Sequence, residues 1–163
     1  MELKTEALHR KSSGVAVFLE SLLADEYVLC VRTRDARRNV YGTNITQLRK
    51  LFGYHCNYLD SVIADISRRV SILGTLVPVT FAHSMEATRL KRHNEKLTGQ
   101  NQIIEALLDD HEAIIGTLRR ESSGTVDKQT DIDTADFMSD LLVQHVEISG
   151  ALRDWLYESD LEN

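Results

Sequence analysis

The sequence predicts an all-α protein built as a four-helix bundle with one long crossover. Apolar residues recur at spacings of three and four in four separate segments, which is the period of a helix that buries one face. Only one proline and eight glycines occur among 163 residues, too few turn residues for a β-sandwich. The links between the four segments are short except the second, which runs for about 25 residues after Gly74.

The first two helices are predicted on either side of a short link. The first carries its apolar stripe from Val15 to Val31 and continues into a charged stretch. The second begins at Asn44, because Asn44-Ile-Thr-Gln47 resembles a capping box, and it ends before Gly74, which suits the left-handed position after a helix. The short link makes these two helices antiparallel neighbours.

The other two helices follow the long link. The third has its stripe from Ile103 to Leu118, and the fourth has its stripe from Phe137 to Trp155. The link can cross the second helix, roughly 43 Å long, so that the third helix starts at the far end, which is the ferritin-like connection. Residues 85–96 within the link have helical composition and are predicted to form a short extra helix.

Composition and charge restrict the class of protein. The 25 acidic and 19 basic residues give a net charge of −6, which disfavours binding to the negatively charged backbone of nucleic acid. We expect one domain at 14–158, an N-terminal tail at 1–13 and a short C-terminal end at 159–163. The chain contains no long apolar stretch and no signal-peptide pattern, so a cytoplasmic protein without a membrane partner is expected. Cys30 and Cys56 are expected to be free, buried thiols.

His111 and His145 are both predicted to face the inside of the bundle, where they could bind a metal ion. A di-iron bundle needs a glutamate from each of two helices and Glu-x-x-His from each of the other two. The residues three positions before His111 and His145 are Leu108 and Leu142. We therefore expect no di-iron centre within one bundle, and we interpret both histidines as hydrogen-bonded residues of the core or of a subunit contact.

Several short motifs, each weak by itself, occur together in a fixed order. They are Leu22-Leu-Ala-Asp-Glu26-Tyr-Val-Leu, Asn39-Val-Tyr-Gly42, Leu59-Asp60, Leu73-Gly74 with Pro78, Leu108-Asp-Asp-His111-Glu112 and Asp133-Thr-Ala-Asp136. In this order and spacing the chain resembles the Dps family of mini-ferritins over nearly its whole length. The resemblance implies a dodecameric homo-oligomeric shell that oxidises Fe(II) with peroxide, stores ferric iron, serves the stress response and in some members coats DNA.

The resemblance does not extend to the ferroxidase ligands of the family. The five ligand positions hold Arg37, Arg49, Gly53, Ala64 and Arg68. Arginine stays protonated and has no acceptor atom, and the other two residues have no donor side chain for iron. We therefore expect the chain to lack catalytic activity by itself and to hold iron only as stored cargo.

In the family this site lies between two subunits, so Arg37 of one subunit is expected to face Arg49 and Arg68 of its neighbour. The three arginines either form a salt-bridged interface with carboxylates or bind an anion such as phosphate. An offset in the alignment is a further alternative, because Asp65 and Ser67 stand beside expected ligand positions. The candidate carboxylates for a salt-bridged interface are Asp35, Asp60 and Asp65.

The fourth helix is preceded or opened by Asp131, Asp133 and Asp136. The resemblance implies that these residues line the threefold pores through which iron enters the shell. The alternative is an N-cap with a favourable helix-dipole interaction, which is common at any helix start. The two interpretations are compatible, because one aspartate can cap the helix while another faces a pore.

Three functions remain open. The first is a shell protein that stores or sequesters iron or another cargo, alone or mixed with an active paralogue. The second is a working ferroxidase with its ligands relocated around His55, Asp60 and Asp65. The third is a nucleoid-associated protein that protects DNA. Residues 1–13 carry a net charge of only +1, and twelve chains at −6 each would carry −72, so we expect weak or absent DNA binding.

Overall fold

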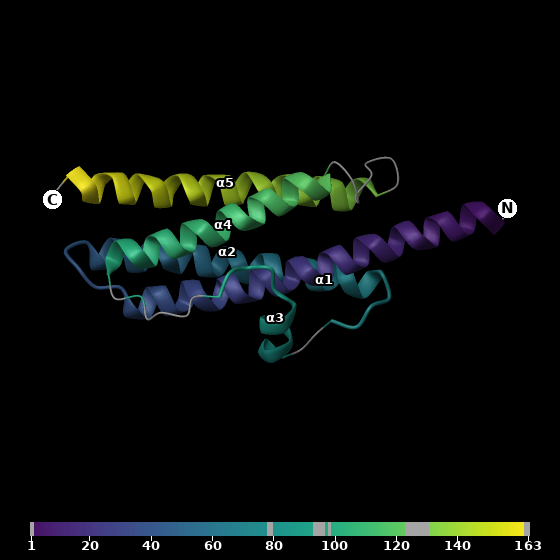
Figure 1. Ribbon diagram of the computed structural model, residues 1–163, viewed down its shortest axis with the longest axis horizontal. Coiled ribbons are helices and arrows are strands. Elements are labelled where there is room, and N and C mark those ends of the chain that lie inside the picture. Colours follow the sequence, from purple (N-terminus) through teal and green to yellow (C-terminus); the bar gives the residue numbers. More distant parts are fainter. Residues whose placement is uncertain (1, 78–79, 93–96, 98, 123–130, 162–163) are drawn as a thin grey trace.

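The structure, a computed structural model, describes the backbone of residues 2–77, 80–92, 97, 99–122 and 131–161, and side chains within 14–158. The side chains of the expected tail and the third link (123–130) lie outside the described residues. The helices are α1 (Glu2–Asn39), α2 (Ile45–Ile72), α3 (Phe81–Ala87), α4 (Gln100–Ser122) and α5 (Ile132–Leu161) (Figure 1). The described part of the chain contains no strand, so the prediction of an all-α bundle with a short extra helix is confirmed.

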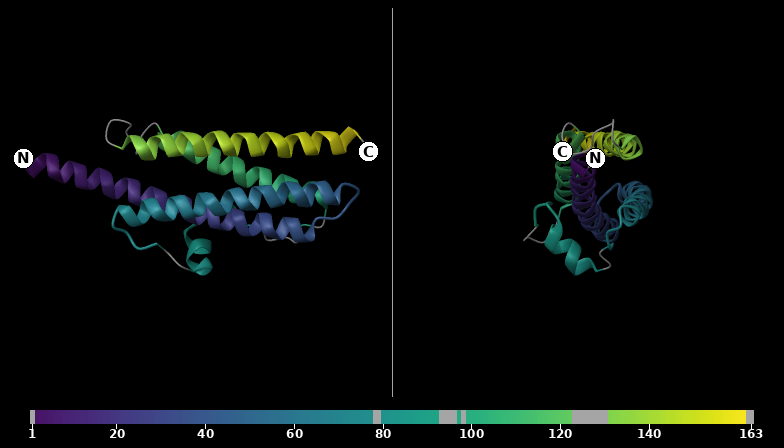
Figure 2. Two further views of the ribbon diagram at one scale, coloured as in Figure 1. Left: turned by 180° about the vertical axis from the view of Figure 1, so that it is seen from behind. Right: turned by 90° about the vertical axis from the view of Figure 1, so that its right-hand side faces the viewer.

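The four long helices lie side by side as an elongated bundle, and the short α3 lies outside it (Figures 1 and 2). Helix α1 packs on α2, α4 packs on α5, and α1 also contacts α4. The apolar stripes predicted from the sequence form one core, with Leu19, Leu59, Ile104 and Leu152 as fully buried members from the four long helices. Burying each such side chain contributes about 2 kcal/mol to folding.

Two buried carboxylates fix the long crossover to the bundle. Asp25 of α1 accepts hydrogen bonds from the backbone N–H and from the side chain of Arg89, at 2.7 and 2.9 Å. Arg32 of α1 donates to both oxygens of Asp110 of α4, at 2.6 and 2.7 Å, and also to a backbone carbonyl of the crossover. The crossover therefore has tertiary anchors of its own, next to the apolar core.

Two helix boundaries and one predicted cap differ from the prediction. Helix α1 already begins at Glu2, so the backbone of the expected N-terminal tail is helical. The extra helix begins at Phe81, earlier than predicted, because the hydroxyl of Thr80 accepts a hydrogen bond from the N–H of His83 and caps its start. Asn44 precedes α2 but makes no side-chain cap bond, so the predicted capping box is wrong.

Other expectations are confirmed. Gly74 follows α2 with φ of 81°, in the left-handed region that favours glycine. Cys30 and Cys56 are both free and buried. Among the helices of the described residues, none is long and apolar enough to cross a membrane.

Candidate functional site

Each of the four long helices contributes one buried ionisable side chain to a group in the middle of the bundle. These are Glu26 of α1, His55 of α2, His111 of α4 and His145 of α5, and none is more than 6% exposed. All four stand on the apolar stripe of their helix, so helix packing forces them into the core. We call these four side chains the interior cluster.

Hydrogen bonds link three members of the interior cluster into a chain. The Nε2 atom of His145 lies 3.0 Å from Oε1 of Glu26. The Nδ1 atoms of His111 and His145 lie 2.8 Å apart, so one imidazole donates and the other accepts, and a single proton lies between them. The ring of His55 meets the ring of His111 edge-on at 6.3 Å between centroids. The expectation that His111 and His145 are hydrogen-bonded core residues is confirmed.

Burial controls the protonation of two of these histidines. Burial lowers the pKa of His55 to about 4. Burial also lowers the pKa of His111 well below its ordinary value, and the neighbouring His145 and His55 lower it further. Both imidazoles are therefore held neutral near pH 7. Some polar atoms of this region have no hydrogen-bond partner, namely Oε2 of Glu26, Nδ1 of His55 and Oγ of Ser149.

The interior cluster does not fit a metal ion as its side chains lie. Two imidazole ligands of a tetrahedral metal, each about 2.0–2.1 Å from the ion, stand roughly 3.3 Å apart. The Nδ1 atoms of His111 and His145 are closer, at 2.8 Å, because they hydrogen-bond to each other. More generally, no group of three or more His, Cys, Asp or Glu side chains within the described residues is arranged to hold a metal ion.

The five positions aligned with the family ligands lie on the outer side of α1 and α2. Arg37, Arg49, Ala64 and Arg68 are exposed, and Gly53 is half-buried. The guanidinium carbon of Arg37 lies only 3.4 Å from the place that a Cβ on Gly53 would take. Arg37 therefore rests on α2 of its own chain, one turn from Arg49. The expectation that Arg37 of one subunit faces Arg49 and Arg68 of its neighbour stays a prediction.

The carboxylates named from the sequence divide between different arginines. Asp65 accepts a hydrogen bond from Arg68 at 2.7 Å, three positions along the same helix. Asp60 pairs instead with Arg34 of α1. Of the three arginines in the predicted cluster, Arg68 has a carboxylate partner among those named from the sequence. The cluster between subunits stays a prediction.

The relocated ligand set of His55, Asp60 and Asp65 is not brought together. His55 is buried in the core, whereas the other two side chains engage arginines at the surface. The exposed side chains beside Gly53 on this face include the guanidinium group of Arg37, which has no acceptor atom for iron. The residues present do not fit iron there.

The aspartates at the start of α5 take different roles. The carboxylate of Asp131 accepts a hydrogen bond from the backbone N–H of Thr134 at 3.0 Å, which is an N-cap. Asp133 and Asp136 are exposed. The capping interpretation is therefore confirmed for Asp131, and the other two carboxylates are free to meet solvent.

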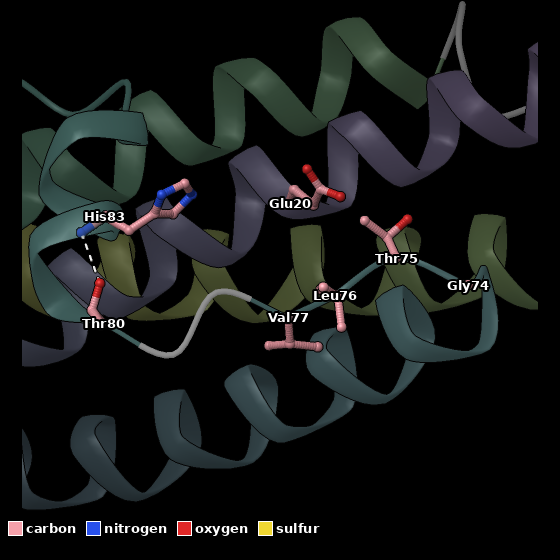
Figure 3. Close-up of a pocket in the computed structure, with 7 residues that line it drawn as sticks. All are labelled: Glu20, Gly74, Thr75, Leu76, Val77, Thr80 and His83. Carbon is pink, nitrogen blue, oxygen red and sulfur yellow. Dashed lines mark hydrogen bonds between the residues drawn. The ribbon is translucent and has the colours of Figure 1, made fainter.

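A pocket of about 600 Å³ lies beside the segment that follows α2, between α1 and α3 (Figure 3). Its lining comes from α1, from the segment after α2 and from α3, and consists of Glu20, Gly74, Thr75, Leu76, Val77, Thr80 and His83. Its charged and titratable groups are one carboxylate and one imidazole. The close-up shows Glu20 on α1 and His83 on α3, on different walls, and the cap bond from His83 to Thr80 at the start of α3 (Figure 3).

Comparison with known proteins gives consistent matches. The model of the ferritin-like domain family matches residues 17–160. An uncharacterised low temperature-induced protein of a Nostoc species is 30% identical over 91% of this chain and 83% of its own length. The DNA protection during starvation protein of Helicobacter pylori is 25% identical over 77% of this chain and 87% of its own length. The structure of Dps from Thermosynechococcus elongatus matches with a TM-score of 0.85 at 21% identity, over 92% of this chain and 94% of that chain.

Proposed function

The chain belongs to the ferritin-like domain family and has the fold of its Dps members, and on that premise we propose that it forms a cytoplasmic shell that stores or sequesters iron under stress. In this proposal the chain does not oxidise iron at the positions that the Dps family uses. The low temperature-induced relative from Nostoc supports a role in the stress response.

One observation carries the proposal. Arg37 lies against Gly53, a position at which the resemblance implies a carboxylate ligand, so a cation stands beside that position. An Fe(II) ion about 4 Å from one such charge is disfavoured by several kcal/mol at an effective dielectric constant near 20. No donor atom at these positions compensates that repulsion.

Assembly and iron entry follow from the same family membership. We propose a dodecamer of roughly 220 kDa, from twelve chains of 18.5 kDa each. Asp133 and Asp136 are exposed at the start of α5, where they can line a pore, and Asp131 holds the helix start beside them. The missing oxidation chemistry would then come from an active paralogue in a mixed shell or from oxidation outside the shell. Light scattering tests the assembly, and a stable monomer would contradict it.

Iron-oxidation kinetics test the loss of the site. The purified protein is expected to oxidise Fe(II) with peroxide no faster than buffer does. Changing Arg37→His, Arg49→His, Gly53→Asp, Ala64→Asp and Arg68→Glu together is expected to restore iron binding, because donors then replace every cation. Reverting only some positions leaves a guanidinium against the metal and is expected to fail.

Crystals soaked in Fe(II) provide a second readout that does not depend on activity. Anomalous scattering is expected to show no iron at the outer α1–α2 face of the unmodified protein, and to show it there after the fivefold change. Fast, saturable oxidation by the unmodified protein, unaffected at these positions, would place a working ferroxidase centre elsewhere and contradict the proposal.

A further inference from the structure

Four basic side chains gather where α1 ends and α2 begins. Arg37 and Arg38 lie in the last turn of α1, and Arg49 and Lys50 follow in the second turn of α2. All four are exposed. Within the residues that the structure describes, none of them has an ion-pair partner, and the Nζ atom of Lys50 lies 6.0 Å from the ring of Tyr54. We call these four side chains the basic face.

The helix pairing places Arg37 on the side of α2 that carries Arg49. The guanidinium carbon of Arg37 comes within 3.4 Å of the Cβ place at Gly53, which is one helical turn after Arg49 on the same side of α2. Glycine leaves room for this approach, because a longer side chain would occupy the space that the guanidinium takes. Two guanidinium groups from different helices therefore share one side of α2.

Nearby carboxylates do not neutralise the basic face. The first turn of α2 contains no acidic residue. Asp60 is engaged by Arg34. Asp35 is exposed and stands three positions before Arg38 on the same face of α1, but within the described residues it forms no ion pair with Arg37 or Arg38. The field of this region reaches the buried thiol of Cys56: burial raises its pKa, and the charges of nearby arginines act in the opposite direction.

We propose that the basic face binds a multivalent oxyanion of the phosphate type, held chiefly by Arg37 and Arg49. Guanidinium groups donate in a fork that matches phosphate oxygens, and they stay charged at any physiological pH. Phosphate is favoured over chloride because a tetrahedral oxyanion can accept from both arginines and also from Arg38 or Lys50. The proposal does not depend on iron storage, so either can fail while the other holds.

A second copy of the chain is the competing occupant. Its carboxylates would pair with Arg37 and Arg49 and leave no free donors for an anion. In that case phosphate would not bind, and removing the arginines would lower the mass of the assembly instead. Measuring both phosphate binding and the mass of the assembly distinguishes an anion from a second copy of the chain.

Isothermal titration of the full chain with pyrophosphate, at fixed ionic strength in chloride buffer, tests the proposal. A saturable one-site isotherm is expected. Arg37→Gln and Arg49→Gln are each expected to weaken binding about tenfold, which is the loss of one charge-assisted hydrogen-bonding group. Arg68→Gln removes the same charge from a paired arginine on the same helix and is the matched control, expected to change binding less than about twofold.

Lysine variants test geometry against charge alone. Arg37→Lys with Arg49→Lys keeps the charge but removes the two forks, and binding is expected to weaken by about tenfold. Light scattering is expected to give an unchanged mass for all variants. No pyrophosphate binding, an equal loss in Arg68→Gln, or a lower mass in the Arg37 and Arg49 variants would each overturn the proposal. Binding of duplex DNA without binding of pyrophosphate would also overturn it.

Discussion

Inside the bundle, Glu26, His111 and His145 are buried and joined by hydrogen bonds, whereas Arg37 and Arg49 on the outer face are exposed and unpaired within the described residues. Both places collect ionisable side chains from different helices. They differ in what surrounds the charge, because water solvates the arginines and only protein surrounds the interior cluster. In the core, three of the ionisable groups form a hydrogen-bonded set and His55 is held neutral by burial, while the surface accepts like charges side by side.

This difference explains why the two places suit different roles. The interior donors are the residue types that bind transition metals, but they already bond to one another. The outer residues have free donors, but those donors suit anions. Substitutions should therefore cost folding stability inside the bundle and change binding outside it.

The largest expected effect comes from breaking the interior cluster at Glu26. Glu26→Leu leaves Nε2 of His145 buried without a partner, and the free energy of unfolding is expected to fall by about 3 kcal/mol. Urea denaturation measures this loss. Glu105→Leu is the matched control, because Glu105 is exposed on α4, and its effect is expected to stay within about 0.5 kcal/mol.

The triple variant Glu26→Leu with His111→Leu and His145→Leu sharpens this test. Replacing all three members of the hydrogen-bonded chain by apolar groups leaves none of their polar atoms unpaired, so much of the lost stability is expected to return. A triple variant no more stable than Glu26→Leu alone would show that the cost comes from packing and not from the orphaned imidazole.

Lowering the pH is expected to reduce the free energy of unfolding through the interior cluster and not through the arginines of the outer face. The pKa of His55 is about 4 in the folded chain and about 6.5 when unfolded, so protonation favours the unfolded state. The resulting stability is present above pH 6.5 and is lost as pH falls from there toward 4. Between pH 7.5 and 5 the loss from this group is about 2 kcal/mol.

Urea denaturation at the two pH values checks this effect with two variants. His55→Phe is expected to reduce the difference between pH 7.5 and pH 5, because it removes a buried group that must be protonated on unfolding. His83→Gln is the control, since His83 is exposed on α3 and is expected to leave the difference unchanged. Equal pH dependence in His55→Phe and the unmodified protein would show that His55 does not cause the loss of stability in acid.

The sequence predicted most of the fold because local signals and packing agree there. Four apolar stripes of helical period predicted the four long helices, and Gly74 marked the end of α2. The predicted cap at Asn44 failed, because a capping box describes a side-chain geometry that the chain does not adopt before α2. The extra helix was displaced, because the Thr80 cap starts it earlier than helical composition suggested.

The candidate sites were less predictable, because they depend on how helices meet. Glu26 and His55 stood in apolar stripes, which marks a buried polar residue, but their meeting with His111 and His145 requires the packed bundle. Likewise, nothing local to Arg37 or Gly53 shows that the guanidinium lies on that glycine. A charged residue in an apolar stripe was the signal that could have found the interior cluster.

A smaller effect is expected on the outer face at Gly53. Alanine is favoured over glycine in a helix interior by roughly 1 kcal/mol, and an added Cβ would lie 3.4 Å from the Arg37 guanidinium, the mobile end of a long side chain. Gly53→Ala is therefore expected to stabilise the protein by about 0.5–1 kcal/mol in urea denaturation. Destabilisation would show that the approach of Arg37 to α2 is rigidly required.

The smallest change in the free energy of unfolding is expected at Arg68, in clear contrast to the large change expected at Glu26 in the interior. Arg68 and Asp65 form an ion pair within one helix, with side chains 65% and 43% exposed. An exposed pair of this kind contributes about 0–1 kcal/mol, so Arg68→Ala is expected to change the free energy of unfolding by less than about 0.5 kcal/mol, without lowering the mass measured by light scattering. Asp65→Ala should give the same small change, because it breaks the same pair. If Arg68→Ala alone dissociates the assembly, a carboxylate of a second copy is the real partner of Arg68. Charged groups of the outer face would then need partners, as those of the interior do.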